Sequence, residues 1–388
     1  MRPRVVSVCL DLSPSHGGMY RAVTDLARML GSPIVTFRDG TGVEPPTQTD
    51  LSVTVVDWSG LSTARQAFLP PASVRRAAAH ALGNADCLLV HSLFRGHAQI
   101  VWQLASERRI PYLVVPHGGL EPALWESRTM LRRAWMLAGG DRFLRDADRI
   151  VFATEGERAH ASQTLQQPLP AAVIPFAVAA IENPRSATDR AAARRRLALP
   201  LDRRMLLVLG RLDPVKQPDA IVHGFCAAAT PRCDLVFAGM DGAVTADSLR
   251  RLVPPELRDR VRFIGAVDNV IRDTVLTACD GYLSWSRHES FGYAAAESLA
   301  AGLPVILPPG HGLRSALDGT ACGLFPADAD QNALVTAIRS FSAWSDDELR
   351  SRGIAGWEWV RQALRPDTVT DLWGSLIADI TQQAVKFA

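Results

Sequence analysis

The sequence lacks the cysteine spacing of a metal or disulfide framework: none of its six cysteines form a Cys-x-x-Cys pair, and several lie in apolar runs. This usage predicts buried, reduced thiols. No apolar run approaches the ~18 residues of a membrane-spanning helix, and the chain enters a strand-like segment at Val5 without the features of a signal peptide. We therefore expect a cytoplasmic, unprocessed protein.

An excess of charge of one sign is also absent. The 42 Lys+Arg residues against 40 Asp+Glu give a net charge of +2, which predicts no global attraction to nucleic acid. Lysine itself is scarce, because it occurs only at positions 216 and 386. Where arginine is so strongly preferred, a lysine inside an ordered motif indicates a need for its compact, flexible ammonium group.

Apolar runs of strand length alternate with stretches of helical period, which predicts an α/β fold with parallel sheets. The length of 388 residues favours two domains, here residues 1–180 and 190–365, joined by an Arg- and Ala-rich linker. The final helix, within residues 366–388, is expected to cross back to the first domain. The expected strands are Val5–Leu10, Ile34–Phe37, Val53–Val56, Cys87–His91, Tyr112–Val115, Ile150–Ala153, Ala172–Ile174, Met205–Leu209, Leu235–Ala238, Arg262–Ile264, Gly281–Ser284, Val305–Leu307 and Gly323–Phe325.

Two loops of the first domain follow expected strands. Ser13–Gly18 contains Gly17 and Gly18 and precedes a helix, so its backbone N–H groups could approach an anion, although a tight turn explains it equally well. It lacks the three-glycine spacing of a dinucleotide site. His117, in Pro116-His117-Gly118-Gly119, would emerge at the carboxyl end of a parallel strand, where α/β folds bind ligands. A lone histidine that satisfies local backbone groups is the alternative.

Two further motifs lie in the second domain. Arg211 and Lys216 follow its first strand and could clamp a diphosphate, or Arg211 could simply pair with Asp213. Glu289 and Glu297 lie on a loop and the helix after it, a separation that suits two ends of an extended ligand. A glycoside-hydrolase pair would need its carboxyl groups within about 9.5 Å. The small and apolar residues around Glu297 indicate that its carboxylate has a dedicated partner.

In this order and spacing the motifs resemble the retaining glycosyltransferases of family four, which have the GT-B fold of two Rossmann-like domains facing each other across a cleft. The resemblance covers nearly the whole chain and includes Gly17-Gly18, Pro116-His117-Gly118, Val173–Phe176, Gly210-Arg211 with Lys216, Glu289/Glu297 and Ala301–Val305. It implies a hexosyltransferase that uses a nucleotide-sugar as substrate, with no cofactor and no metal. The stretch Pro116–Pro122 is similar to members that build bacterial surface polysaccharides.

The resemblance also implies roles for individual residues. Glu289 would contact the donor sugar, and Glu297 the ribose hydroxyls. Donor binding would further involve Gly17, Gly18, Ser290, Phe291 and Gly292, the last two through backbone donors. Arg211 and Lys216 would hold the diphosphate and stabilise the leaving group, and His117 would lie near the anomeric centre.

The sequence departs from the family pattern at Ala177, where a glycine is common, and at Cys322, where a small polar residue is common. These departures concern hinge geometry and donor fit. Two other classes remain open at this stage, a nucleotide-sugar epimerase of the same fold and a non-catalytic sugar-nucleotide-binding protein. The second class would be expected to lose charged site residues, and here they are present.

Two Asp-x-Asp spacings, Asp146/Asp148 and Asp328/Asp330, are candidate metal ligands, but we expect both to be structural. A last feature combines basic and bulky apolar residues within residues 125–145, where they would suit an anionic membrane surface near a glycan or lipid-linked acceptor. An ordinary amphipathic helix is the alternative. Its members are Trp125, Arg128, Met130, Leu131, Arg132, Arg133, Trp135, Met136, Leu137, Arg142, Phe143 and Arg145.

Overall fold

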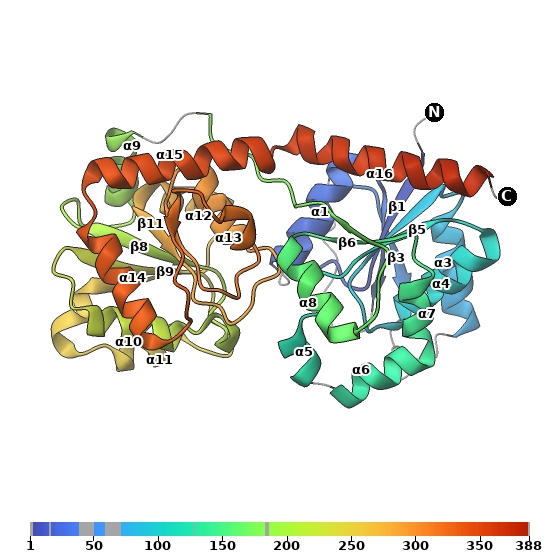
Figure 1. The fold of residues 1–388 in the computed structure, drawn as a ribbon, viewed down its shortest axis with the longest axis horizontal. Coiled ribbons are helices and arrows are strands. Elements are labelled where there is room, and N and C mark those ends of the chain that lie inside the picture. The colour runs from blue at the N-terminus through green and yellow to red at the C-terminus, as the bar shows by residue number, and fades with distance from the viewer. Residues whose placement is uncertain are drawn as a thin grey trace. The chain divides into compact units, whose positions relative to one another are not determined.

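The computed structural model describes residues 3–14, 17–38, 50–58, 71–127, 129–182 and 186–386. The chain forms two compact units, residues 1–177 with 366–388, and residues 178–365. Each unit contains one parallel sheet with helices around it (Figure 1). The second unit begins at Val178, before the Arg- and Ala-rich segment, so that segment belongs to the second unit.

Unit 1 has a sheet with the strand order β3-β2-β1-β4-β5-β6-β7. Its central strands are buried on both faces, which explains their uninterrupted apolar sequences. The strands are β1 (Val5–Cys9), β2 (Ile34–Arg38), β3 (Val53–Asp57), β4 (Cys87–His91), β5 (Tyr112–Val115), β6 (Arg149–Phe152) and β7 (Ala171–Val173). All seven strands expected in this half are present within one or two residues.

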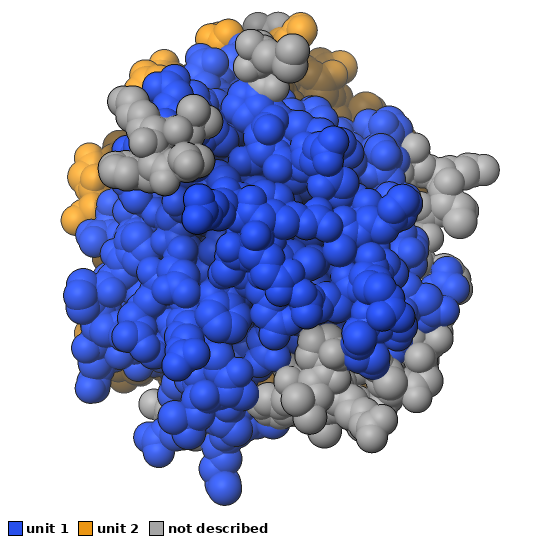
Figure 2. All heavy atoms as spheres, turned by 90° about the vertical axis from the view of Figure 1, so that its right-hand side faces the viewer, with its two compact units in different colours: residues 1–177, 366–388 blue, residues 178–365 orange. Residues whose placement is uncertain are grey.

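The helices of unit 1 pack on this sheet, and Figure 2 shows the heavy atoms of this unit in blue. They are α1 (Gly18–Leu30), α3 (Ala72–Leu82), α4 (Gly96–Arg108), α5 (Pro122–Ser127), α6 (Thr129–Trp135), the π-helical turn η2 (Met136–Gly140), α7 (Asp141–Arg145), α8 (Glu155–Leu165) and the C-terminal α16 (Pro366–Lys386). Helix α16 contacts α1. The buried residues Val369, Trp373, Ile377 and Ile380 have the spacing of one helical face.

Unit 2 repeats the plan with the order β10-β9-β8-β11-β12-β13. Its strands are β8 (Arg204–Leu209), β9 (Cys233–Ala238), β10 (Val261–Gly265), β11 (Gly281–Leu283), β12 (Val305–Ile306) and β13 (Gly323–Leu324). The six strands expected in this half are all present. Its helices are α9 (Ala187–Arg196), η3 (Pro214–Lys216), α10 (Pro218–Ala228), α11 (Ala246–Leu252), η4 (Pro255–Arg260), α12 (Asn269–Ala278), α13 (Tyr293–Ala300), η5 (Ser315–Leu317), α14 (Gln331–Ala343) and α15 (Asp346–Ala363).

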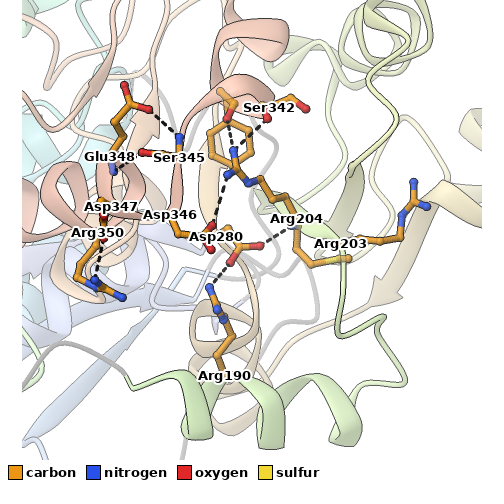
Figure 3. A network of polar contacts seen from close by, with 12 residues as sticks. Arg190, Arg203, Arg204, Asp280, Ser342, Ser345, Asp346, Asp347, Glu348 and Arg350 are labelled. Atoms are coloured by element: carbon orange, nitrogen blue, oxygen red, sulfur yellow. Dashed lines mark hydrogen bonds and ion pairs between the residues drawn. The ribbon is translucent and has the colours of Figure 1, made fainter.

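A buried carboxylate explains part of the arginine-rich sequence of α9. Asp280, at the start of β11, is 3% exposed and accepts hydrogen bonds from Arg190 (2.9 Å), Arg194 (2.5 Å) and the backbone of Met205 (2.7 Å). Figure 3 shows Asp280 with Arg190, beside a second contact between Arg204 and Asp346 (3.4 Å). These contacts attach α9 to the amino end of the sheet, opposite the edge at which the candidate site residues lie.

The six cysteines are all free, and five of them are buried. None of the helices in the described part of the chain is long and apolar enough to cross a membrane.

Candidate functional site

In unit 2, the loops after β8 and β11 bring Lys216 and Glu289 together. The two strands are neighbours in the sheet, so the loops after them leave from the same edge. Lys216 Nζ lies 3.2 Å from Glu289 Oε2, and both side chains are partly buried. The Glu289 carboxylate raises the pKa of Lys216. Burial alone would raise the pKa of Glu289, but the nearby ammonium group keeps it below its ordinary value. Both groups are therefore charged at neutral pH.

Gly210 makes room for this lysine. Its φ of +132° lies outside the range that side chains readily adopt, and a Cβ at this position would lie 3.3 Å from Lys216 Cε. Gly239 in turn packs on the Gly210 carbonyl, because a Cβ there would lie 2.1 Å from that oxygen. The glycine before Arg211 therefore shapes the path of the lysine side chain.

The start of α13 lies beside Glu289 and has no side-chain cap. Its N-cap residue is Gly292, with a φ of +86°. The backbone N–H groups at the start of a helix carry partial positive charge, which favours the binding of an anion there. Phe291 is 2% exposed and packs edge-on against Tyr293, so its side chain faces the core. Of Phe291 and Gly292, only backbone atoms are then suited to a ligand contact.

His311, which the sequence analysis missed, covers Gly292. A Cβ on Gly292 would lie 2.3 Å from His311 Cε1, and the His311 ring is 3% exposed. Burial lowers its pKa to about 4, so the ring is neutral at physiological pH. The loop that carries it is joined to the Glu289 loop by a hydrogen bond from Gly312 N to Glu289 O (2.7 Å). The two glycines that flank His311, Gly310 and Gly312, are the feature of the sequence that could have indicated this residue.

Glu297 lies on α13 and has the partner that its apolar surroundings required. Arg272, on α12, places Nη1 3.1 Å from Glu297 Oε1. Arg211 makes the pair with Asp213 that the sequence left open as an alternative: its Nε donates to Asp213 Oδ2 at 2.6 Å, and 54% of its side chain is exposed. Ser290, between Glu289 and Phe291, is partly buried.

In unit 1, His117 follows β5 in a tight turn. It has a φ of +51°, which is unusual for a residue other than glycine, and Gly119 N closes the turn on Pro116 O at 3.0 Å. The neighbouring residue Gly118 donates its N–H to Glu157 Oε1 at 2.6 Å. The turn therefore holds the imidazole at the carboxyl edge of the sheet with a strained backbone, a feature that is often found at functional sites.

Three other side chains hold the His117 turn in place. His91, at the end of the neighbouring β4, places Nδ1 2.9 Å from His117 Nε2, and the ring of Phe176 stacks on His117 at 5.5 Å. Burial lowers the pKa of His117 to about 4. Glu157 Oε2 also accepts from Ala153 N (2.8 Å). The adjacency of β4 and β5 could have indicated His91, whereas no sequence signal indicated Glu157.

Gly17 and Gly18 lie at the start of α1, after β1. Gly17 has a φ of +54° and open space where a Cβ would be, so its backbone conformation rather than crowding requires glycine. The neighbouring residues Ser15 and His16 lie outside the described residues.

Three of the four Asp-x-Asp residues accept hydrogen bonds within local structure. Asp146 accepts from Trp102 Nε1 (2.9 Å), and Asp148 from Tyr112 N (2.9 Å). Asp330 caps α14 by accepting from Ala333 N at 2.8 Å, as expected.

The basic and apolar segment is not one amphipathic helix but the succession α5, α6, η2 and α7. Trp135 and Phe143 are in the core, which corrects their expected place on a membrane-facing surface. Arg132 lies over the ring of Phe94, 5.0 Å from its centroid. Other members are exposed, and we call them the α6–η2 patch: Met130, Leu131, Arg133, Leu137, Arg142 and Arg145.

Comparisons with known proteins agree with this architecture. Residues 11–177 match a family model described as "Glycosyl transferase 4-like domain", and residues 189–354 match "Glycosyl transferases group 1". The chain is 30% identical over 250 residues to a D-inositol 3-phosphate glycosyltransferase of Kineococcus radiotolerans. That match covers 61% of this chain and 57% of the relative, so it spans less than two thirds of the relative's length.

Solved structures show the same fold. A sucrose-phosphate synthase of Thermosynechococcus elongatus superposes with a TM-score of 0.78 at 20% identity, covering 98% of this chain and 100% of that one. HepE of Anabaena, in complex with UDP and glucose, superposes with a TM-score of 0.77 at 14% identity, covering 97% and 100%. The chain shares the GT-B fold of two Rossmann-like domains with these structures, and a family model matches each domain, so the chain belongs to the group 1 glycosyltransferases.

Proposed function

We propose that the protein is a retaining glycosyltransferase that moves a sugar from a nucleotide-diphosphate sugar to an acceptor hydroxyl, in the synthesis of a bacterial polysaccharide or glycoconjugate. The observation that carries the proposal is the Lys216–Glu289 pair at 3.2 Å beside the uncapped start of α13. It combines a cation, a carboxylate and the positive end of a helix at one sheet edge. A nucleotide-sugar needs these three partners for its diphosphate and its sugar hydroxyls.

The ion pair gives a physical order of events when the donor binds. Without a ligand, Lys216 and Glu289 neutralise each other. A bound diphosphate would compete for the Lys216 ammonium group and leave the Glu289 carboxylate free to accept hydrogen bonds from sugar hydroxyls. As the bond to the diphosphate breaks, negative charge grows on the leaving group, and Lys216, which is already bound to the diphosphate, continues to neutralise it.

The other site residues have supporting roles in the proposal. Glu297, held by Arg272 at 3.1 Å, would accept from the ribose hydroxyls. Arg211 would leave Asp213 to contact the diphosphate, which its exposure of 54% makes easy. His117 would bind the transferred sugar. The HepE structure, which holds UDP and glucose, supports a donor of the UDP-sugar type.

Thermal unfolding with UDP, GDP and ADP, each free and as a glucose or mannose conjugate, tests donor binding. A ligand at ~100 times its dissociation constant stabilises by ~2.7 kcal/mol. We expect one base to raise the melting temperature, and Lys216→Ala to abolish the shift. Arg211→Ala, which removes a proposed diphosphate contact, should reduce the shift. Arg250→Ala is its matched control and should not, because both arginines are 54% exposed and paired with a nearby aspartate. Absence of any shift in the wild type would contradict the proposal.

Product analysis separates the proposed activity from the alternatives. A retaining transferase keeps the anomeric configuration of the donor in its product, which NMR of the purified glycoside reads directly. An epimerase would convert the donor without an acceptor, and a binding protein would leave it unchanged.

The α6–η2 patch supports a second part of the proposal, contact with an anionic membrane surface that carries a lipid-linked acceptor. Met130 is 87% and Leu137 90% exposed, and Leu131 is 53% exposed. Exposed arginines accompany these apolar side chains. Apolar groups that can enter the headgroup region, together with basic groups that attract anionic lipid, are the combination that interfacial binding requires.

A further inference from the structure

The contact between His91 and His117 determines what chemistry His117 can perform. We propose that His91 is a positioning residue that fixes His117 as a neutral ring with its proton on Nδ1. His117 then acts as a hydrogen-bond donor to a substrate oxygen and not as an acid or a base. This inference rests on the proposed function for the identity of the substrate, but the assignment of the proton is independent of it.

His91 is fully buried beside His117. Its ring is 0% exposed, and Nδ1 lies 2.9 Å from His117 Nε2. The other nitrogen, Nε2, is buried and has no hydrogen-bond partner within the described part of the chain. Only one proton can lie between the two rings, so His91 carries it on Nδ1 or His117 carries it on Nε2.

The two arrangements differ in what they leave buried. If His117 donates from Nε2, the neutral His91 must carry its proton on Nε2, where a buried N–H group would have no acceptor. If His91 donates from Nδ1, its Nε2 is an unmatched lone pair. An orphaned buried N–H is rare in native structures, and an under-satisfied acceptor is less so. The second arrangement is therefore favoured.

His97, six residues along the chain, shows that this environment accepts such a lone pair. Its Nε2 lies 3.0 Å from the His91 carbonyl oxygen, which can only accept, so His97 must carry its proton on Nε2. The nitrogen left without a partner is Nδ1, which is buried. In the ring where the proton is fixed by its partner, the unmatched atom is thus the lone pair.

It follows that His117 accepts at Nε2 and carries its proton on Nδ1. The His91 hydrogen bond holds the ring at its Nε2 edge, and the ring of Phe176 stacks on it at a centroid distance of 5.5 Å. Among the described residues nothing hydrogen-bonds to His117 Nδ1, and the residue is only partly buried. A rigid N–H donor is therefore available at the sheet edge. The ligand atom that this N–H group would bind is a hydroxyl or phosphate oxygen.

The same geometry argues against proton transfer by His117. A second proton on Nε2 would point at the N–H group of His91, and Nδ1 already carries a proton in the neutral ring. The burial that lowers the pKa of His91 and His117 agrees with two neutral rings. Glu157 and Glu121 are the acidic groups near this turn, and neither is hydrogen-bonded to the His117 ring among the described contacts.

The test is ¹⁵N NMR of the full chain labelled at histidine, with His117→Gln for assignment. In the wild type we expect the ¹H–¹⁵N pattern of a neutral His117 with its proton on Nδ1. His91→Leu removes the donor and should mix the two tautomers, whereas His91→Asn places an amide N–H near the position of Nδ1 and should preserve the pattern. His97→Gln, which can keep the bond to the His91 carbonyl, is the matched control and should leave the His117 signals unchanged.

Kinetics with the donor found by the binding screen provide the second measurement. We expect His91→Leu to lower kcat about tenfold, the effect of one hydrogen bond, with little change in the KM for the donor. His91→Asn should recover most of the activity. A wild-type His117 protonated at Nε2, or a His91→Leu pattern identical to the wild type, would overturn the inference. Should no nucleotide-sugar bind, the proposed function fails while the NMR result still decides the position of the proton.

Discussion

Lys216 Nζ and Glu289 Oε2 lie 3.2 Å apart, although 72 residues separate them in the chain. The contact exists because β8 and β11 are neighbours in the sheet, so a loop that follows the first strand meets a loop that follows the fourth. Both side chains are about a quarter exposed. The pair is therefore accessible to a ligand while its low-dielectric surroundings strengthen the attraction.

The four charged and polar site residues should divide into two kinetic classes. Lys216→Ala and Glu297→Ala should mainly raise the KM for the donor, because they remove contacts made equally before and during the reaction. Glu289→Ala and His117→Ala should mainly lower kcat, about tenfold or more, because their contacts strengthen in the transition state. Initial-rate kinetics over a range of donor concentrations measure both. Wild-type kinetics in all four variants would refute the site assignment.

The His311–Gly292 packing predicts a sensitive backbone position. Gly292→Ala places a Cβ 2.3 Å from His311 Cε1 at a φ of +86°, so we expect a loss of unfolding free energy of about 2 kcal/mol or more. Gly319→Ala is the matched control, because its φ is +77° and open space surrounds it. It should cost about 1 kcal/mol from backbone strain alone. Urea denaturation measures both. Equal losses in the two variants would show that His311 does not restrict this position.

The sequence indicated the strands well and the site residues only in part. Segments such as β4 and β5 were predictable because strands buried on both faces need uninterrupted apolar residues. Lys216 and Glu289 were identified by their places after strands. Their contact was not predicted, because pairing across the sheet depends on the strand order, which no local pattern reveals.

Arg211 and His311 show the limits of local patterns. For Arg211 the sequence left two possibilities open, a diphosphate clamp with Lys216 and a pair with Asp213, and the described structure has the pair with Asp213 at 2.6 Å. His311 had no visible role, because its importance comes from covering a glycine 19 positions earlier. Glu157 was hidden for the same reason, since its partner Gly118 belongs to another segment.

The buried Glu157 predicts a pH dependence of stability. Burial raises its pKa to about 7 from an ordinary 4.5, so the folded protein holds this proton more tightly than the unfolded chain does. The contribution is fully present below about pH 4.5 and is lost as the pH rises through about 7. Glu157→Gln cannot titrate. The unfolding free energy of the wild type relative to this variant should therefore fall by up to ~3 kcal/mol across this interval.

Denaturation of both proteins at several pH values measures this difference. Glu155→Gln, on the same helix, is the control, because Glu155 is 59% exposed and paired with Arg158. Its difference from the wild type should not follow the same curve. A constant difference for Glu157→Gln between pH 4.5 and 7 would contradict the raised pKa.

We expect sugar transfer to continue in the presence of EDTA. Lys216 supplies positive charge for the diphosphate, and the Asp148 and Asp330 carboxylates already accept backbone hydrogen bonds at 2.9 and 2.8 Å. Transfer rates with EDTA and with added Mg²⁺ or Mn²⁺ should agree within about twofold, a difference in barrier of less than 0.5 kcal/mol. Activity that disappears with chelator and returns with either ion would overturn this expectation and direct attention to carboxylates elsewhere in the chain.

The α6–η2 patch predicts binding to anionic vesicles. Leu137, 90% exposed, and Met130, 87% exposed, can enter the headgroup region, while Arg133 and Arg142 attract anionic lipid. Each basic residue near such a surface contributes about 1 kcal/mol, so Arg133→Glu with Arg142→Glu should weaken binding by about tenfold or more. Leu137→Ser tests the apolar part of the interaction, which salt does not screen.

The control is Arg250→Glu with Arg251→Glu in unit 2, which changes the net charge by the same amount. It should leave binding intact, because these arginines lie on α11 and not in the α6–η2 patch. Sedimentation with phosphatidylglycerol and phosphatidylcholine vesicles at low and physiological salt measures these effects. Equal binding to both lipids, no binding at low salt, or an equal loss in the unit 2 control would each show that the patch does not recognise an anionic membrane.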